Sequence, residues 1–346
     1  MSPPLVSVVI PGYNCARYVA ETLDSVLAQS YANFEVVFVD DGSTDATPDI
    51  LAGYRDRIVY RRTANGGLAA ARNAGMKLAR GEFIAWLDAD DVCDPDRLLV
   101  QSAYLCRRSE VVAVSSQFSA FDATRGVFDQ EYAARYYSQV RTHGFGGLFP
   151  VSEPFDARGI WWMDGSKLPH AVRVHSGEVW RRLILGNFMH PPTLMLRRSA
   201  RERVGWLREG LRMAEDWDYI LRLAELGSMA LIDAPLLRYR CHPGQMSGDS
   251  NSAQAARSGL EVLSLQLAEH PERVAGMEEA IHKSLASHHA SIAYSLAEEE
   301  RLQALGHLLQ ALRFDRKQAN FGRNLARIMA GHAGLGLLRQ LRGISA

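Results

Sequence analysis

The strongest constraint on the fold is a regular alternation between two sequence periods over the first 120 residues. Short runs rich in β-branched and aromatic residues recur, and helical patterns such as TLDSVLAQS and GLAAARNAGMKLA fill the gaps between them. The predicted strands are Val6 to Ile10, Phe34 to Val39, Ile58 to Arg61, Phe83 to Leu87 and Val111 to Ser115. This rhythm indicates βαβ units, and it predicts an α/β fold with a mixed, mostly parallel sheet flanked by helices.

A helical region is predicted to follow this α/β domain. Beyond residue 191, a strand-like TLMLR, a helix opening at EDWDYILRLAELG, a strand MALID and the segment LLRYRCH appear in turn, and from residue 253 onward leucines recur at helical spacing. The polar stretch GDSNS at 248–252 marks the boundary. We therefore expect a domain of residues 1–247, with halves of about 1–118 and 119–247, and a C-terminal helical region of 248–346.

Residues 120–180 show no sustained period. They are rich in glycine and aromatic residues, as in YYSQVRTHGFGGLFP and GIWWMDG. Loops that shape a substrate surface and ordinary packing are both compatible with this composition.

Composition and charge narrow the class of partner. Of the 346 residues, 47% are hydrophobic, and 39 lysines and arginines balance 39 aspartates and glutamates, so no overall field attracts nucleic acid. The four cysteines have neither CxxC spacing nor the density of a disulfide scaffold, which favours a reducing compartment. The N-terminus has no basic segment before an apolar run, and no stretch reaches the roughly 18 apolar residues of a spanning helix. We expect a globular cytoplasmic protein.

The end of the chain is basic. From residue 313 onward, seven basic residues stand against one acidic residue, with apolar residues between them. The basic residues are Arg313, Arg316, Lys317, Arg323, Arg327, Arg339 and Arg342, and the apolar ones are Phe314, Phe321, Leu325 and Ile328. One interpretation is contact with anionic lipid headgroups, worth about 1 kcal/mol per basic residue near the surface. The other is a helix packed on the catalytic domain with a solvated basic face.

Three predicted strands are each followed directly by a short motif of polar and turn-forming residues. VSVVI runs into PGYN, FEVVFV into DDGSTD, and FIAWL into DADD. Ligands of open α/β sheets bind beyond the carboxyl ends of the strands, so these motifs are expected to meet at one edge. There a divalent cation would offset the repulsion among Asp88, Asp90 and Asp91, with Asp88 and Asp90 pointing the same way in an extended segment. The alternative is that these acids cap the helix near Pro95, although Asp94 already suits that role.

The other two motifs offer groups that fit a nucleoside. The carboxylates of Asp40 and Asp41 suit the N–H of a base or the hydroxyls of a ribose, and Tyr13 offers a flat face for stacking. A turn-forming role for the acids and a core position for the tyrosine are the alternatives. Arg72 has three interpretations: pairing with a diphosphate, pairing with Asp90, or covering the face of a predicted helix, Gly67 to Ala79. On that helix Leu68, Ala71, Gly75 and Leu78 form one stripe, with Arg72 off it.

Taken together, five motifs resemble those of the family 2 glycosyltransferases, which are inverting enzymes with a GT-A fold. VSVVIPGYN, VVFVDDGSTD, NGGLAAARNAG, FIAWLDADD and AEDWDYILRLAELG occur in that order between about residues 5 and 245. The resemblance implies transfer of a sugar from a nucleoside diphosphate donor, commonly a UDP-sugar, to an acceptor hydroxyl, with a divalent metal such as Mn²⁺ or Mg²⁺. It also implies a nucleotide-binding first half and an acceptor-binding second half.

The resemblance assigns roles residue by residue. Pro11, Tyr13 and Asn14 frame the base, Asp41 with Asp40 contacts the uracil, Arg72 assists the donor, Asp88 contacts ribose or sugar, Asp90 is a metal ligand, and Asp216, with Glu215 beside it, is the catalytic base. A role in favouring the helix dipole is the alternative for the two acids of EDWD. YRCHPGQMSG resembles a YRxH segment, which makes His242 a candidate metal or diphosphate contact, against a purely structural role.

Two other classes of protein remain as alternatives, and one is excluded. PGYNCA does not supply the GxGxxG of a dinucleotide-dependent dehydrogenase. A sugar-nucleotide nucleotidyltransferase is closer in fold, although no glycine-rich basic loop is present near the N-terminus; a non-catalytic sugar-nucleotide-binding protein is the second alternative. The resemblance favours a carbohydrate or lipid-linked saccharide as acceptor, in cell-surface polysaccharide or glycolipid synthesis at the inner face of the cytoplasmic membrane.

Overall fold

The computed structural model describes residues 3–156, 171–246, 248, 251–298, 300–317 and 321–330. The chain divides into two compact units. One, the sheet unit, consists of Met1–Gly210 and Glu215–His242; the other, the helical unit, consists of Leu211–Ala214 and Pro243–Ala346. The sheet unit ends a few residues before the limit of 247 that we expect from the sequence, and the two halves proposed within it stay an interpretation.

The sheet unit is built on one mixed sheet. Its strands follow the order β3-β2-β1-β4-β10-β6-β11-β9-β8, with β5 paired to β11 and β7 to β6. The strands are β1 (Val6–Gly12), β2 (Phe34–Asp40), β3 (Val59–Arg62), β4 (Phe83–Trp86), β5 (Val92–Cys93), β6 (Val111–Asp122), β7 (Gly126–Asp129), β8 (Val151–Asp156), β9 (Ala171–Gly177), β10 (Met195–Arg197) and β11 (Ser228–Arg240). The first four predicted strands are present and parallel to one another, and β6 is parallel to β11. β10 runs antiparallel between β4 and β6.

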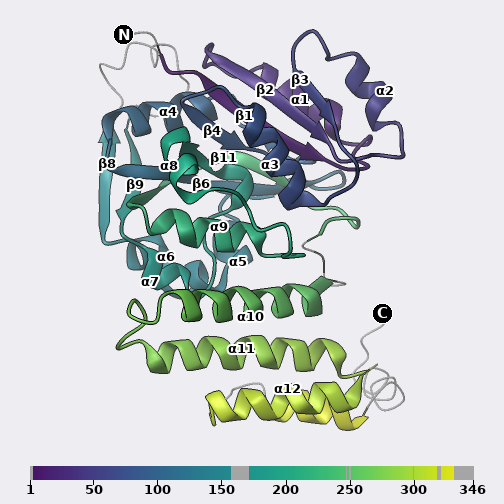
Figure 1. Cartoon of the computed structure of the whole chain (residues 1–346), viewed down its shortest axis with the longest axis vertical. Helices are drawn as coiled ribbons and strands as arrows, with labels where there is room; N and C mark the ends of the chain where they lie inside the picture. Colours follow the sequence, from purple (N-terminus) through teal and green to yellow (C-terminus); the bar gives the residue numbers. More distant parts are fainter. Residues whose placement is uncertain are drawn as a thin grey trace. The chain divides into compact units, whose positions relative to one another are not determined.

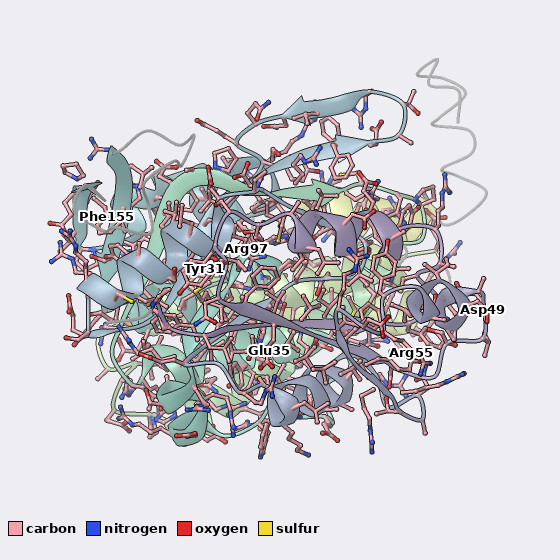
Figure 2. The ribbon with its side chains drawn as sticks, turned by 90° about the horizontal axis from the view of Figure 1, so that it is seen from above. Tyr31, Glu35, Asp49, Arg55, Arg97 and Phe155 are labelled. Carbon is pink, nitrogen blue, oxygen red and sulfur yellow. The ribbon has the colours of Figure 1, made fainter. Side chains whose placement is uncertain are left out.

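Helices flank this sheet (Figure 1). They are α1 (Val19–Leu27), α2 (Thr47–Ala52), α3 (Leu68–Leu78), α4 (Arg97–Arg107), α5 (Ala133–Tyr136), α6 (Ser138–Leu148), α7 (Trp180–Leu183), the 3-10 turn η2 (Pro191–Thr193), α8 (Arg198–Val204) and α9 (Glu215–Ala224). Figure 2 shows Arg97 of α4 within the body of the unit, whereas Asp49 of α2 and Arg55 lie at its margin. The predicted α/β class, with a mixed sheet, flanking helices and C-terminal helices, is confirmed.

Helix α3 corrects one expectation from the sequence. Leu78, predicted to lie on its buried stripe, is 38% exposed, whereas Arg72, predicted to lie off it, is only 1% exposed. α3 packs against β1 and β2 through Gly75, where a Cβ would lie 2.4 Å from Val9 Cγ1. This close approach turns the helix so that Arg72 faces the interior, where carboxylates neutralise it. A hydrophobic pattern cannot show such a buried ion pair.

The helical unit contains three long helices that lie side by side (Figure 1). They are α10 (Ser252–Glu269), α11 (Glu278–Leu296) and α12 (Arg301–Phe314); residues 321–330 are also helical. Its core contains Ile292, Leu296, Leu308 and Ile328, with Phe321 and Leu325 packed against it. These last two residues and Ile328 are three of the four apolar residues that one interpretation assigns to lipid; the fourth, Phe314, packs against Ala286, Ala290 and Ala311. In this structure they pack within the protein.

Some expectations fall outside the described residues. These are the GIWWMDG segment at 159–165, part of the GDSNS boundary, and Arg339 and Arg342 of the basic tail. Among the helices that are described, none has the length and apolar character needed to cross a bilayer.

Candidate active site

The predicted edge of the sheet is formed by the ends of β1, β2 and β4. β1 lies between the other two strands, and Gly12 is in register with Asp40. After β1 the chain turns at Asn14, whose φ of 49° lies in the left-handed region that asparagine tolerates. The Asn14 side-chain oxygen accepts the N–H groups of Thr44 (2.8 Å) and Asp45 (3.3 Å), which joins the loops after β1 and β2. Tyr13 is 50% exposed, so its ring is free to stack on a planar ligand.

Asp40 and Asp41 both organise loops of the protein itself. Asp40 has no exposed surface, and its two oxygens accept the N–H of Ser43 (2.8 Å) and the hydroxyl of Tyr60 (2.9 Å). Asp41 is 4% exposed. Its oxygens accept the N–H groups of Gly66 (3.0 Å) and Gly67 (2.8 Å), just before α3, and the hydroxyl of Thr63 (3.2 Å). Their assignment to the base of a donor stays a prediction, and of the two only Asp41 reaches the surface.

The DADD segment forms a turn, not the extended segment expected. The N–H of Asp91 donates to the carbonyl of Asp88 at 3.2 Å, which redirects the chain from β4 into β5. Asp88 pairs with Arg72 Nη2 at 2.6 Å, so of the three interpretations of Arg72 the pairing with Asp90 is replaced by one with Asp88. Asp90 Oδ2 lies 3.0 Å from His242 Nε2, and Asp91 Oδ1 accepts the N–H of Arg240 at 2.9 Å. Each of the three carboxylates therefore has its own partner, although burial, followed by the charges of Asp90 and Asp88, raises the pKa of Asp91 well above its ordinary value.

Arg72 connects the end of β4 to the start of α9. Its Nη1 lies 3.4 Å from Glu215 Oε1, and its guanidinium lies 5.1 Å from the ring centroid of Trp86. The side chain is 1% exposed, and burial of a lone cation would be unfavourable, so the charge depends on Asp88 and Glu215. The DADD turn and the EDWD helix, which are far apart in the sequence, thus meet at one buried arginine.

Glu215 and Asp216 occupy the first turn of α9. Burial, reinforced by the neighbouring Asp216, raises the pKa of Glu215 to about 7, although Arg72 opposes the shift. Burial also raises the pKa of Asp216, again against the effect of Arg72. Glu215 is buried and Asp216 is half-buried, so Asp216 is the more accessible carboxylate. The buried residues of this helix include Trp217, Ile220, Leu221 and Ala224.

Asp90 and His242 form the candidate metal site. Their side chains are 33% and 14% exposed, and they are already in contact. No group of three or more His, Cys, Asp or Glu side chains suited to a metal occurs among the residues that the structure describes. Two protein ligands nevertheless fit Mg²⁺ or Mn²⁺ when a nucleotide provides phosphate oxygens, because such ions keep several waters and are commonly bound through one or two carboxylates. The oxygen and nitrogen donors present suit Mn²⁺ in particular.

A comparison with protein families identifies the first part of the sheet unit. Residues 7–159 match the model described as Glycosyl transferase family 2. Over these residues the chain matches the family that the five motifs indicate, so the resemblance is confirmed there.

Relatives and solved structures agree with this family. The uncharacterized glycosyltransferase RT0329 of Rickettsia typhi is 28% identical over 242 residues, which are 70% of this chain and 65% of that relative, so the chain spans less than two thirds of its length. The crystal structure of S. aureus TarS 1–349 has a TM-score of 0.57 at 19% identity, covering 93% of this chain and 87% of that one. The mannosyltransferase PcManGT from Pyrobaculum calidifontis, in complex with GDP-Man and Mn²⁺, also has a TM-score of 0.57 at 19% identity, covering 95% and 81%. These likenesses confirm the GT-A fold.

Sequence reasoning missed several residues of the candidate site. The Trp86 ring lies 5.1 Å from the Arg72 guanidinium, Tyr18 contacts His242, and Arg240, which pairs with Glu21, contacts Asp90. The only signal in the sequence was the spacing of Arg240 and His242, two residues apart at the end of a strand. Arg97 was also missed: it is fully buried and donates to the carbonyls of Trp86 and Leu194. Burial raises the pKa of Asp88, and the charge of Arg97 opposes that rise.

Proposed function

We propose that this chain is an inverting glycosyltransferase that transfers a sugar from a nucleoside diphosphate donor, a UDP-sugar by preference, to an acceptor hydroxyl. One observation carries the proposal. Arg72 joins the carboxylates after β4 to those at the start of α9, so that candidate donor and base residues meet in one site. The family match over residues 7–159 supports it, as do two similar structures of other proteins, TarS 1–349 in complex with UDP-GlcNAc and PcManGT in complex with GDP-Man.

The donor half of the proposal uses the strand ends. Tyr13 would stack on the base beside Pro11 and Asn14, with Asp41 accepting from the base and Asp40 supporting its loop. Asp88 would accept a hydroxyl of the ribose or sugar. Asp90 and His242 would hold Mn²⁺ or Mg²⁺, which, when bound, neutralises charge on the leaving diphosphate.

The acceptor half uses the start of α9. Asp216 would accept the proton of the acceptor hydroxyl while the acceptor oxygen forms a bond to the anomeric carbon. The bond from that carbon to the phosphate oxygen breaks on the opposite face, and its electron pair leaves with the diphosphate. Burial raises the pKa of Asp216, so this carboxylate is a stronger base than one in water. Glu215 pairs with Arg72. Because its pKa is about 7, Glu215 takes up a proton below neutral pH.

A donor screen tests this proposal. The full chain would be incubated with UDP- and GDP-sugars, with Mn²⁺ or with excess chelator, and released nucleoside diphosphate and the anomeric configuration of the product would be measured. We expect release with Mn²⁺, loss of release with chelator, and a product of inverted configuration. Full turnover in chelator would remove the metal role. Formation of a sugar nucleotide from a nucleoside triphosphate would indicate a nucleotidyltransferase, and binding without turnover a non-catalytic protein.

For the acceptor we propose a class of compound, a carbohydrate or lipid-linked saccharide. The reaction would belong to cell-surface polysaccharide or glycolipid synthesis, at the cytoplasmic face of the membrane. Contact with anionic lipid would depend on charge, through residues such as Arg316 and Lys317, because Phe321 and Leu325 pack inside the helical unit. Binding to anionic vesicles at low salt that is lost at high salt would support this contact, and no binding at low salt would contradict it.

A further inference from the structure

We propose that Arg240 is a positioning residue that holds Asp90 and His242 in the arrangement needed to take up a divalent cation with a donor diphosphate. The proposal rests on the proposed function, since it concerns the same site. The effect of Arg240 would pass through the two residues that it places.

Arg240 binds the DADD turn with both its main chain and its side chain. It is the last residue of β11 and is 8% exposed. Its backbone N–H donates to Asp91 Oδ1 at 2.9 Å, and its Nε donates to the carbonyl of Asp90 at 2.7 Å. The main-chain carbonyl of Asp90 and the side-chain carboxylate of Asp91 are therefore both tied to the end of β11, which restrains the turn that carries the Asp90 side chain.

The guanidinium is itself held from three sides. Nη2 lies 2.6 Å from Glu21 Oε2 of α1, and the rings of Tyr18 and Phe121 lie 4.9 and 4.4 Å from the guanidinium carbon. Arginine has a planar fork that can donate in two directions while stacking on aromatic faces, whereas lysine has a single nitrogen. These contacts explain why an arginine, not any cation, suits this position.

The same group of residues places His242. Two residues after Arg240, the imidazole lies 3.0 Å from Asp90 Oδ2, and its ring centroid is 4.6 Å from that of Tyr18. Tyr18 thus contacts both Arg240 and His242. Arg240 therefore restrains the main chain at Asp90 through a hydrogen bond, and at His242 through its position two residues earlier in the chain. Two ligands restrained in this way can receive one ion with little reorganisation. Supporting groups of this kind commonly change metal affinity by about 10- to 100-fold when they are removed.

The test measures how much Mn²⁺ tightens nucleotide binding. The dissociation constants of UDP and of GDP would be measured by calorimetry with Mn²⁺ and with chelator, for the full-length parent and for Arg240→Lys. We expect the parent to show tighter binding with Mn²⁺, and Arg240→Lys to reduce that enhancement by about 10-fold or more, with metal-free binding unchanged. Glu21→Ala, at an exposed helix position that should fold normally, would reduce it in the same direction but by less.

Arg197→Lys is the matched control. Arg197 also donates through Nε and Nη2 to main-chain carbonyls, of Val111 (2.8 Å) and Arg108 (2.9 Å), and lies 5.5 Å from the ring of Phe83, but it is not part of the site. It should lower the thermal midpoint and leave the Mn²⁺ enhancement intact.

Three outcomes would overturn the proposal. A parent-like enhancement in both Arg240→Lys and Glu21→Ala would overturn the role of Arg240 alone. An equal loss in Arg197→Lys would show that general destabilisation is responsible. Absence of any Mn²⁺ effect in the parent would overturn both this role and the metal-dependent function.

Discussion

At the scale of residues, the site balances five carboxylates against buried arginines. Arg72 neutralises Asp88 and Glu215, and Arg240 binds the main chain of the DADD turn. The two acids at the start of α9 therefore lie in different environments. Glu215 is buried and ion-paired, with a pKa of about 7, whereas Asp216 is more exposed and available to a substrate. Because they interact, the two titrate as a pair.

The pH dependence of transfer should report this pair. Asp216 must be unprotonated to act as a base, and burial raises its pKa, so kcat/KM should fall with decreasing pH at a higher pH than an ordinary aspartate would give. Glu215→Gln removes a negative neighbour and leaves more of the Arg72 charge to Asp216. Both effects lower the pKa of Asp216, so the acidic limb of the profile should move to lower pH.

The pH dependence of stability should also change in Glu215→Gln. The folded-state pKa of Glu215 is raised above its ordinary value of 4.5. Its contribution to stability is therefore present below pH 4.5 and is lost as the pH rises through about 7. Glu215→Gln should abolish that loss in denaturant titrations. An acidic limb at the same pH in both proteins would exclude the coupling between the two acids.

At the scale of elements, the position of α3 determines where Arg72 lies. Its Gly75 faces β1, and a methyl group there would meet Val9. Gly75→Ala should therefore destabilise the sheet unit by about 1 to 3 kcal/mol, as overpacking does. Gly306→Ala in α12 is the matched control, because nothing lies within 4 Å of its added Cβ, and the higher helix propensity of alanine should make it neutral or stabilising. Chemical unfolding measures both. A neutral Gly75→Ala would show that α3 does not approach the sheet this closely.

The elements also show what the sequence can predict and what it cannot. Runs such as Phe34 to Val39 have the strand period, and turn residues follow them, so the strands and the edge carrying PGYN, DDGSTD and DADD follow from local pattern. Which charged side chains pair with one another does not follow from local pattern. Arg72 is paired with Asp88 because of how α3 rotates on the sheet, and Arg240 meets Asp90 because β5 pairs with β11. Such pairings depend on distances across the fold that a one-dimensional pattern does not contain. The antiparallel position of β10 between β4 and β6 likewise depends on tertiary structure.

At the scale of the whole molecule, the basic tail contributes to the helical unit. Ile328 is 5% exposed in its core, Asn324 Nδ2 donates to the carbonyl of Ala290, and Arg327 pairs with Glu298 at 2.6 Å. Ile328→Ala should therefore lower the free energy of unfolding by about 2 to 5 kcal/mol. Its neighbour Met329 is 74% exposed, so Met329→Ala should stay within about 0.5 kcal/mol of the parent. If Ile328→Ala unfolded like the parent, the tail would not be packed, and its apolar residues would be available to lipid.

We propose that two carboxylates of one site perform separate tasks, and a paired measurement on two variants separates these tasks. Calorimetry with the donor nucleotide and Mn²⁺ would be run beside a sugar-transfer assay for Asp216→Asn and Asp90→Ala. Asp216→Asn should bind nucleotide like the parent and lower transfer by about 10² to 10⁴, the usual contribution of a general base. Asp90→Ala should weaken nucleotide binding as well, because a cation ligand is lost. Transfer by Asp216→Asn at close to the parent rate would contradict the account and direct the search for the base to Glu215 and Asp218.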